Sequence, residues 1–164
     1  MNQADAVKLI EKGVPANEVQ RWADLGCGKG TFTLALAGLL PAGSEIFAYD
    51  KDRQQIPFLH DHTSLNFQRL DFVKDALPFG DWDGILMANS LHYVSDKASL
   101  LERLAAPRYI IIEYENRLPN PWVPFPVPAK NLADLFRIMD YRTAVIGRRP
   151  SRFGSEMYSL LAIK

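Results

Sequence analysis

The sequence predicts an α/β domain that is built on a mostly parallel sheet and ends in an antiparallel hairpin. Apolar strand segments alternate with helical segments along the chain, and the segments at 84–88 and 109–112 are apolar almost throughout. Strands that are buried on both faces lose the usual alternation of polar and apolar residues, which is typical of a parallel sheet. Because the chain has 164 residues, we expect it to form one domain over residues 1–164.

The first half of the chain contains two strand-turn-helix units and a third strand. A short helix is expected first, and residues 1–20 would form a short N-terminal helical cap. Asp52 is a suitable N-cap for the polar helix that follows the second strand. The predicted elements are a helix at 4–12, a strand at 21–25, a helix at 31–40, a strand at 46–49, a helix at 52–60 and a strand at 65–70.

The second half of the chain continues this order and then departs from it. A helix starting at Ser95 separates the two buried strands, and a last helix is expected at 132–139. The final strands, at 143–146 and 156–163, are too close in sequence for a crossover helix between them, which makes them an antiparallel hairpin. Five prolines between Pro119 and Pro128 predict an extended, proline-rich loop at 115–130.

Composition and charge exclude several classes of protein. Nineteen basic and nineteen acidic residues give a formal net charge of zero, so no overall electrostatic field draws the chain to nucleic acid or to an anionic membrane, and neither is expected as a partner. No apolar run approaches the roughly 18 residues that span a bilayer. Residues 1–15 lack the features of a signal peptide. The single cysteine, Cys27, and few histidines predict no disulfide and no metal site, and we expect a cytoplasmic protein.

Three strand-end loops carry residues suited to a nucleoside. Gly26, Gly28 and Gly30 let the first turn approach a ligand closely. Asp50 follows the second strand about 20 residues later, where a carboxylate can accept hydrogen bonds from ribose hydroxyls. Asp71 ends the third strand. Each residue alone has an ordinary alternative, namely a tight connection, a solvated loop aspartate or a helix cap, but the three together predict an adenosine-type ligand.

The chain resembles the class I S-adenosylmethionine-dependent methyltransferases in five segments. These segments are Asp24–Gly30, Tyr49-Asp50, Leu70–Phe72, Asp75–Phe79 and Asp83–Tyr93. The resemblance extends from Trp22 to the end of the chain. It implies a doubly wound, seven-stranded, mostly parallel sheet with helices on both faces, and S-adenosyl-L-methionine as cofactor. The cofactor-binding residues that it implies are Asp24, Gly26, Cys27, Gly28, Gly30, Asp50, Lys51, Asp71, Phe72 and Asn89.

Two other nucleotide-binding classes fit the turn less well. Dinucleotide-binding dehydrogenases share the first two loops, but their fingerprint is G-x-G-x-x-G/A, and the candidate third positions here, Thr31 and Thr33, do not fit it. The C-terminal hairpin also disfavours a dehydrogenase. Lys29 lacks the glycine spacing of a phosphate-binding P-loop, so that class is excluded.

The acceptor side of the site is less determined. The resemblance implies that His92 and Tyr93 lie beside the reacting methyl group, and His92 is a candidate catalytic base, with a pocket-shaping role or a plain loop histidine as the alternatives. Cys27 is expected to admit the cofactor through its small side chain rather than to act as a nucleophile. Candidate substrate residues are Tyr93, Tyr114, Trp122 and Phe125, the last two in the proline-rich loop.

Trp122 and Phe125 would form a wall of the acceptor site. Alternatively, the proline-rich loop only covers the edge of the sheet, or it is a ligand for a domain that binds proline-rich segments. Little sequence precedes the first strand, so there is little chain to form a cap that encloses a substrate. The acceptor could therefore be a small molecule, which we favour, or a macromolecule, and a partner chain could complete the site. The sequence therefore predicts a methyltransferase with an unidentified acceptor and leaves the oligomeric state open. The alternative is a cofactor-binding, non-catalytic subunit of a methyltransferase complex.

Overall fold

One seven-stranded sheet forms the centre of the molecule. The computed structural model describes residues 1–57, 62–76, 80–115, 117–151 and 155–164. The strand order is β3-β2-β1-β4-β5-β7-β6, with β1 to β5 parallel and β7 antiparallel to both of its neighbours. The strands are β1 (Arg21–Leu25), β2 (Glu45–Asp50), β3 (Ser64–Arg69), β4 (Gly84–Ala88), β5 (Arg108–Tyr114), β6 (Arg142–Pro150) and β7 (Glu156–Ile163). The predicted fold class is confirmed.

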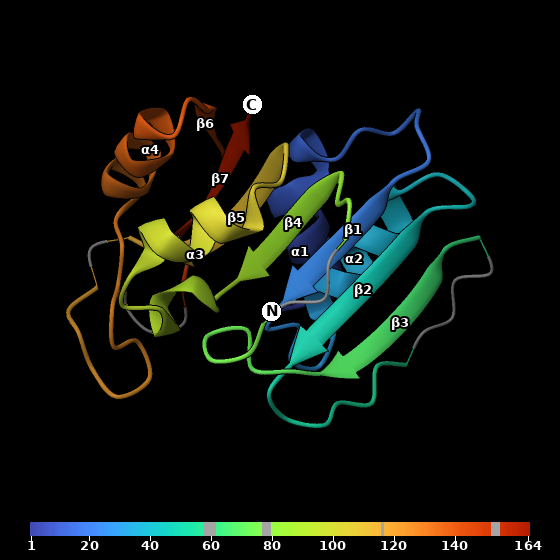
Figure 1. Cartoon of the computed structure of the whole chain (residues 1–164), viewed down its shortest axis with the longest axis horizontal. Coiled ribbons are helices and arrows are strands. Elements are labelled where there is room, and N and C mark those ends of the chain that lie inside the picture. The colour runs from blue at the N-terminus through green and yellow to red at the C-terminus, as the bar shows by residue number, and fades with distance from the viewer. Residues whose placement is uncertain (58–61, 77–79, 116, 152–154) are drawn as a thin grey trace.

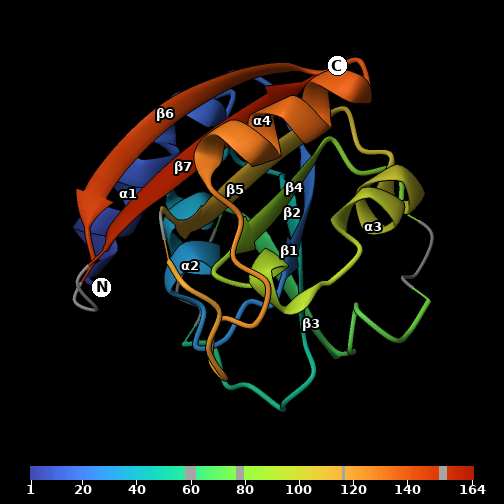
Figure 2. The same cartoon turned by 90° about the vertical axis from the view of Figure 1, so that its left-hand side faces the viewer.

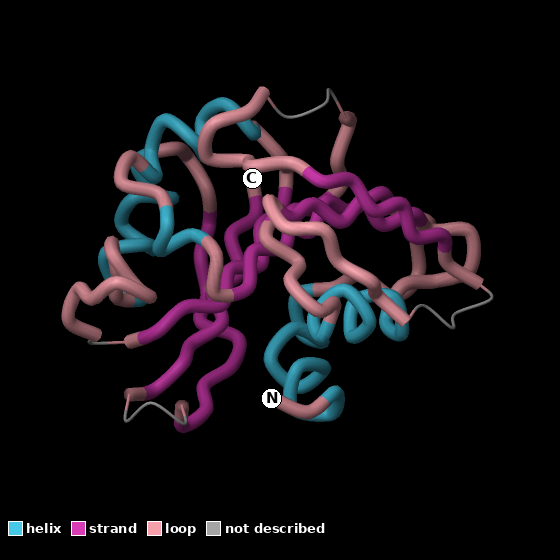
Figure 3. Tube along the Cα trace, turned by 90° about the horizontal axis from the view of Figure 1, so that it is seen from below, coloured by secondary structure: helices cyan, strands magenta, loops and turns pink. Residues whose placement is uncertain are grey.

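Helices cover both faces of this sheet (Figures 1 and 3). Alternate residues of the central strands face opposite sides, so Leu86 packs in the α1 and α2 layer while Ile85 and Met87 pack in the α3 and α4 layer. This burial on both faces is the reason why β4 and residues 109–112 of β5 are continuously apolar. The helices are α1 (Gln3–Ile10), α2 (Thr31–Leu39), α3 (Lys97–Leu104) and α4 (Ala129–Ile138), with short 3-10 turns η1 (Glu11–Gly13) and η2 (Leu91–Tyr93).

The β6–β7 hairpin forms one side of the sheet, with α4 on one face and α1 on the other (Figure 2). The predicted antiparallel pairing is confirmed, but β6 is longer than the predicted 143–146 segment. Its pairing with β7 continues to Pro150, opposite Glu156, and Arg148 forms ion pairs with Glu115 and Glu156 at this end of the strands. The N-terminal segment lies in this part of the fold as well: Ala6, Leu9 and Ile10 are core residues, and α1 covers the sheet face beside α2.

One predicted helix is absent where the structure can be described. Residues 52–57 are not helical, and residues 58–60 of the expected 52–60 helix lie outside the described residues. Proline disfavours a helical conformation in the residue before it, so Pro57 opposes a helix through Ile56. Ile56 instead packs against the turn after β1, where its side chain lies next to Gly30.

The carboxyl ends of β1, β2, β3 and β4 lie at the same edge of the sheet, as the arrowheads in Figure 1 show. The register places Leu25 of β1 beside Tyr49 of β2, and Asp50 beside Arg69 of β3. The loops that follow these strands are therefore neighbours. No helix within the described ranges is both long enough and apolar enough to cross a membrane.

Candidate functional site

The glycine turn after β1 is held closely against the neighbouring loops. Gly26 and Cys27 both donate their backbone N–H to the Tyr49 carbonyl oxygen, at 2.8 and 3.0 Å. Gly26 has φ of 80°, and a Cβ there would lie 2.5 Å from the Ser90 Cβ, so a side chain at this position has no room. Gly28 also has positive φ, 51°, but a Cβ at this position would meet no atom within 4 Å. The backbone at Gly28 therefore faces open space.

Asp50 connects the turn after β1 with the loop after β2. Its Oδ2 accepts the Gly28 N–H at 2.8 Å, and its Oδ1 accepts the Asp52 N–H at 2.9 Å. Oδ1 also accepts a longer hydrogen bond from Gln54 Nε2, at 3.4 Å, whereas Oδ2 keeps a second lone pair for another donor. Asp50 is only 9% exposed, and it lines a cavity at the strand ends. Its carboxylate can therefore order the loops and accept hydrogen bonds from a ligand at the same time.

This first cavity has a volume of about 270 Å³ and lies between the loops that follow β1, β2, β3 and β4. Asp71 caps its own turn: its Oδ1 accepts the Val73 N–H at 3.1 Å, while its Oδ2 lies 3.6 Å from Lys74 Nζ. The Lys51 ammonium lies 5.9 Å from the centre of the Tyr93 ring. The sequence-predicted residues that line the cavity are Gly26, Asp50, Lys51, Asp71, Phe72, Asn89 and Tyr93.

A second cavity, of about 300 Å³, lies over the turn between β1 and α2 and is lined by Asp24, Gly26, Cys27, Gly28 and Asn89, among others. Two buried acceptors lie here without partners among the described residues, Asp24 Oδ1 and Asn89 Oδ1. Buried acceptors are almost always paired in native proteins, so these two oxygens at one cavity can accept hydrogen bonds from a ligand or from water. Asn89 also has φ of 55°, a left-handed conformation in which asparagine is enriched.

Asp24 is the most perturbed carboxyl of the site. It is 1% exposed, and burial raises its pKa from 3.8 to about 7, with a smaller contribution from the negative charge of Asp50. The hydrogen bond from Thr33 Oγ1 to Asp24 Oδ2, at 2.6 Å, acts in the opposite direction. A positively charged ligand group at Oδ1 would stabilise the ionised form.

Cys27 and Gly30 complete the turn. Burial raises the pKa of the Cys27 thiol, and the carboxylates of Asp24 and Asp50 add to this effect. Because the thiolate is the reactive form, this environment favours the small-side-chain interpretation over a nucleophile. Gly30, with φ of 82°, does not line either cavity; it contacts Ile56 and precedes α2. Its role is to shape the turn.

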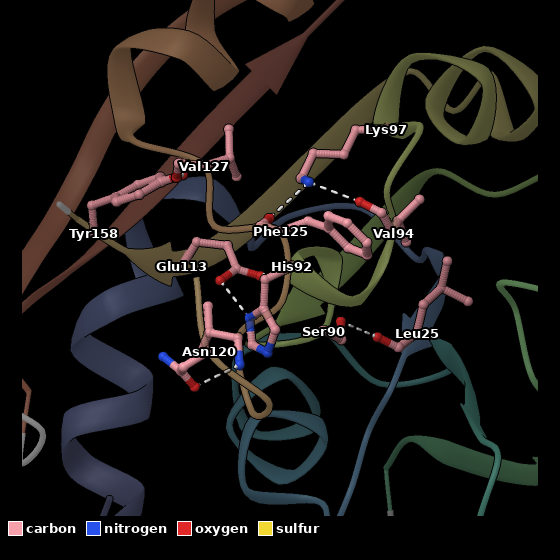
Figure 4. A network of polar contacts seen from close by, with 11 residues as sticks. Leu25, Ser90, His92, Val94, Lys97, Glu113, Asn120, Phe125, Val127 and Tyr158 are labelled. Atoms are coloured by element: carbon pink, nitrogen blue, oxygen red, sulfur yellow. Dashed lines mark hydrogen bonds and ion pairs between the residues drawn. The ribbon is translucent and has the colours of Figure 1, made fainter. Parts of the chain in front are cut away.

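His92 lies in η2 and is paired with Glu113 of β5 (Figure 4). Glu113 Oε1 accepts the His92 backbone N–H at 3.0 Å, and Oε2 lies 2.8 Å from Nδ1 of the ring. Both residues are buried, at 2% and 0% exposure. Sequence reasoning missed Glu113, although an acidic residue inside the otherwise apolar β5 run was a usable signal.

A third cavity, of about 410 Å³, lies beside this pair and has aromatic walls. It brings together the sequence-predicted Asn89, His92, Tyr93, Tyr114 and Trp122, and adds Arg117 and Val123. Trp122 is 74% exposed.

Phe125 is not among the described residues that line this third cavity, and its ring centre lies 5.8 Å from Lys97 Nζ. The proline-rich loop is fixed on its C-terminal side: Phe125 donates its N–H to the His92 carbonyl, and Lys97 Nζ donates to the carbonyls of Val94 and Phe125 (Figure 4). Tyr158 adds a hydrogen bond to the Val127 carbonyl, at 2.7 Å. Phe125 therefore anchors the wall on which Trp122 is carried.

Solved structures, among them a methyltransferase, share this fold. The YcgJ protein of Bacillus subtilis is 14% identical, with a TM-score of 0.72 and 97% of each chain covered. Magnesium protoporphyrin IX methyltransferase of Synechocystis PCC 6803 was solved with bound SAH (S-adenosylhomocysteine) and is 14% identical to this chain, with a TM-score of 0.71. The match covers 99% of this chain and 81% of that chain. At these identities, the likeness is one of fold.

The sequence itself identifies the family. Residues 23–106, half of the chain, match the methyltransferase-domain family, and the chain therefore belongs to it, as the resemblance to class I S-adenosylmethionine-dependent methyltransferases predicted. A curated relative, trans-aconitate 2-methyltransferase of Mycolicibacterium gilvum (strain PYR-GCK), is 32% identical over 92 residues. That match covers 56% of this chain and 35% of the relative, so the chain spans about a third of the relative's length.

Proposed function

We propose that this protein transfers a methyl group from S-adenosylmethionine to a small-molecule acceptor held in the aromatic third cavity. The observation that carries the proposal is the position of Asn89, which lines all three cavities. Tyr93 also lines both the first cavity and the aromatic one, so the two cavities at the glycine turn adjoin the aromatic cavity. When bound, S-adenosylmethionine supplies a methyl group activated by a positively charged sulfur. The protein then has to orient the two reactants and exclude water.

The residues present fit this cofactor. Asp50 would hold the ribose through its Oδ2, which accepts one hydrogen bond among the described residues and has a second lone pair. Asp71 with the Phe72 backbone would hold the adenine amino group. Asp24 and Asn89 would accept hydrogen bonds from the ammonium group of the methionine part. The two unpaired oxygens, Asp24 Oδ1 and Asn89 Oδ1, support this last assignment because an ammonium supplies several donors.

The aromatic cavity supports a small acceptor. Its volume of about 410 Å³ is within the usual range for small-molecule sites, and Tyr93, Tyr114 and Trp122 offer flat apolar surface to an acceptor. The Mycolicibacterium relative and the Synechocystis neighbour are both named for methylating small molecules. The zero net charge is consistent with this choice, and the single cysteine supports a reducing compartment, the cytoplasm.

The proposal is tested by incubating the purified protein with S-adenosylmethionine and pools of small molecules, and by measuring the SAH that forms. We expect one or more pools to give SAH above the acceptor-free rate, and Asp50→Ala to reduce this gain when S-adenosylmethionine is not saturating. Tight SAH binding together with no turnover on any pool would favour the non-catalytic subunit instead.

A further inference from the structure

Glu113 uses both carboxylate oxygens on one residue. One oxygen accepts the His92 backbone N–H and the other lies 2.8 Å from the ring nitrogen Nδ1. An ionised carboxylate has no proton to donate, so a hydrogen bond with it requires the proton on Nδ1. In the neutral imidazole, the other nitrogen, Nε2, then has a free lone pair.

Nε2 lies on the side of the ring away from Glu113 (Figure 4). Among the described residues, none forms a hydrogen bond with it, and His92 lines the aromatic cavity. The ring is held from several sides: the Tyr93 and Tyr114 rings lie 4.4 and 6.0 Å away, and the His92 carbonyl accepts the Phe125 N–H. The imidazole is therefore fixed with one nitrogen occupied and the other available to a ligand.

We infer that Glu113 is a positioning residue that holds His92 with its proton on Nδ1, so that Nε2 removes a proton from an acceptor hydroxyl carried on an aromatic ring. This inference rests on the proposed function. A carboxylate acceptor is ionised at neutral pH and needs no base, whereas a phenolic hydroxyl, with a pKa of about 10, keeps its proton until it reacts. The flat walls formed by Tyr93, Tyr114 and Trp122 suit a ring.

The proton balance of the step follows from this geometry. The hydroxyl proton moves to Nε2 while the oxygen lone pair forms the new bond to the methyl carbon. The electron pair of the breaking carbon–sulfur bond stays on the donor's sulfur. His92 becomes an imidazolium, whose positive charge is offset by the adjoining Glu113 carboxylate, and it later releases the proton to water.

Glu113→Gln tests the positioning role directly. The side-chain amide offers one oxygen and one NH2 group, and the His92 backbone N–H needs the oxygen. The NH2 group then faces Nδ1, which must become the acceptor, so the ring proton moves to Nε2. We expect ¹⁵N NMR of histidine-labelled, ligand-free protein to report Nδ1–H in the wild type and Nε2–H in the variant. His92→Gln assigns the signal among the three histidines.

Glu115→Gln is the matched control. Glu115 also comes from this part of the chain, but it accepts the Ala129 N–H and pairs with Arg148, and neither contact involves His92. The control should retain the wild-type tautomer. An Nε2–H signal in the wild type overturns the inference, even if Glu113→Gln fails to fold, and an unchanged tautomer in a folded Glu113→Gln variant overturns it as well.

The acceptor class is tested with a panel of phenols and the corresponding aromatic carboxylic acids. We expect methylation of phenols only, and a loss of about 10²–10⁴-fold in kcat in Glu113→Gln, the usual contribution of a positioned base, with SAH affinity unchanged by calorimetry. Methylation of the acids alone, or of neither group, overturns the hydroxyl assignment. Failure of the wild type to bind SAH would instead overturn the proposed function. The tautomer measurement is made on ligand-free protein, so its result does not depend on SAH binding.

Discussion

The buried carboxyl of Asp24 should make the ligand-free protein less stable as the pH rises towards 7. Its pKa is raised to about 7 in the folded state, against 3.8 as its ordinary value, so between these values the folded chain holds a proton that the unfolded chain has lost. Stability then falls with increasing pH across this window and becomes constant above it. At about 1.4 kcal/mol per pH unit, the fall between pH 5 and pH 8 is about 3 kcal/mol.

Asp24→Asn removes this dependence. The asparagine oxygen can still accept the Thr33 hydroxyl, and the amide NH2 takes the place of the unpaired Oδ1. Leaving that donor unpaired costs about 1–3 kcal/mol, but the cost is the same at both pH values and cancels when they are compared. The stability of the variant relative to wild type should therefore rise by about 3 kcal/mol between pH 5 and pH 8.

Urea unfolding of the ligand-free wild type and variant at both pH values measures this difference. Asp81→Asn, at an exposed position, is the control and should give the same relative stability at both. An equal relative stability of Asp24→Asn at pH 5 and pH 8 would refute the reasoning, because Asp24 would then titrate alike in the folded and unfolded chains. In the wild type, stabilisation by SAH should also increase as Asp24 ionises, and Asp24→Asn should lose most of it.

Three further predictions concern the two sides of the site. Asp50→Ala should weaken SAH binding by about 1.5–3 kcal/mol by calorimetry, with a smaller loss in Asp50→Asn, and should lower the melting temperature because the Gly28 N–H loses its acceptor. Gly26→Ala should destabilise the fold strongly, because its Cβ would meet Ser90 in addition to the cost of positive φ. Gly28→Ala carries only the cost of positive φ, so it should destabilise the fold less and mainly reduce SAH affinity, and the opposite order would contradict the assigned orientation of the turn. Trp122→Ala should raise the acceptor KM and leave SAH affinity unchanged, and a loss of SAH binding would place this side chain on the cofactor instead.

The sheet was predictable because its signals are local. The apolar runs of β4 and β5 are long enough to indicate burial on both faces, and the short connection before β7 leaves no room for a crossover helix. Ligands of open α/β sheets bind at the carboxyl ends of the strands, which predicts that Gly26, Asp50 and Asp71 lie close together. All three line the first cavity.

The features that sequence reasoning missed depend on contacts between distant segments. Glu113 and His92 are 21 residues apart, and their pairing follows from the position of η2 beside the end of β5. The Asp50 bond to Gly28 connects residues 22 apart and gives Asp50 a structural role that its position alone does not indicate. At residues 52–57, polar periodicity suggested a helix, but the restriction imposed by Pro57 is the stronger effect.

Calorimetric titration of the ligand-free protein with SAH and with NAD is the most direct test of the central claim that these strand-end loops bind a methyl-donor cofactor. The same ligands should be compared by melting temperature, because a ligand that binds only the folded state stabilises it by about 2.7 kcal/mol at a hundredfold excess over Kd. We predict binding of one SAH per chain, a clear rise in melting temperature, and little effect of NAD. Tighter binding of NAD than of SAH, or no binding of SAH, would contradict the account.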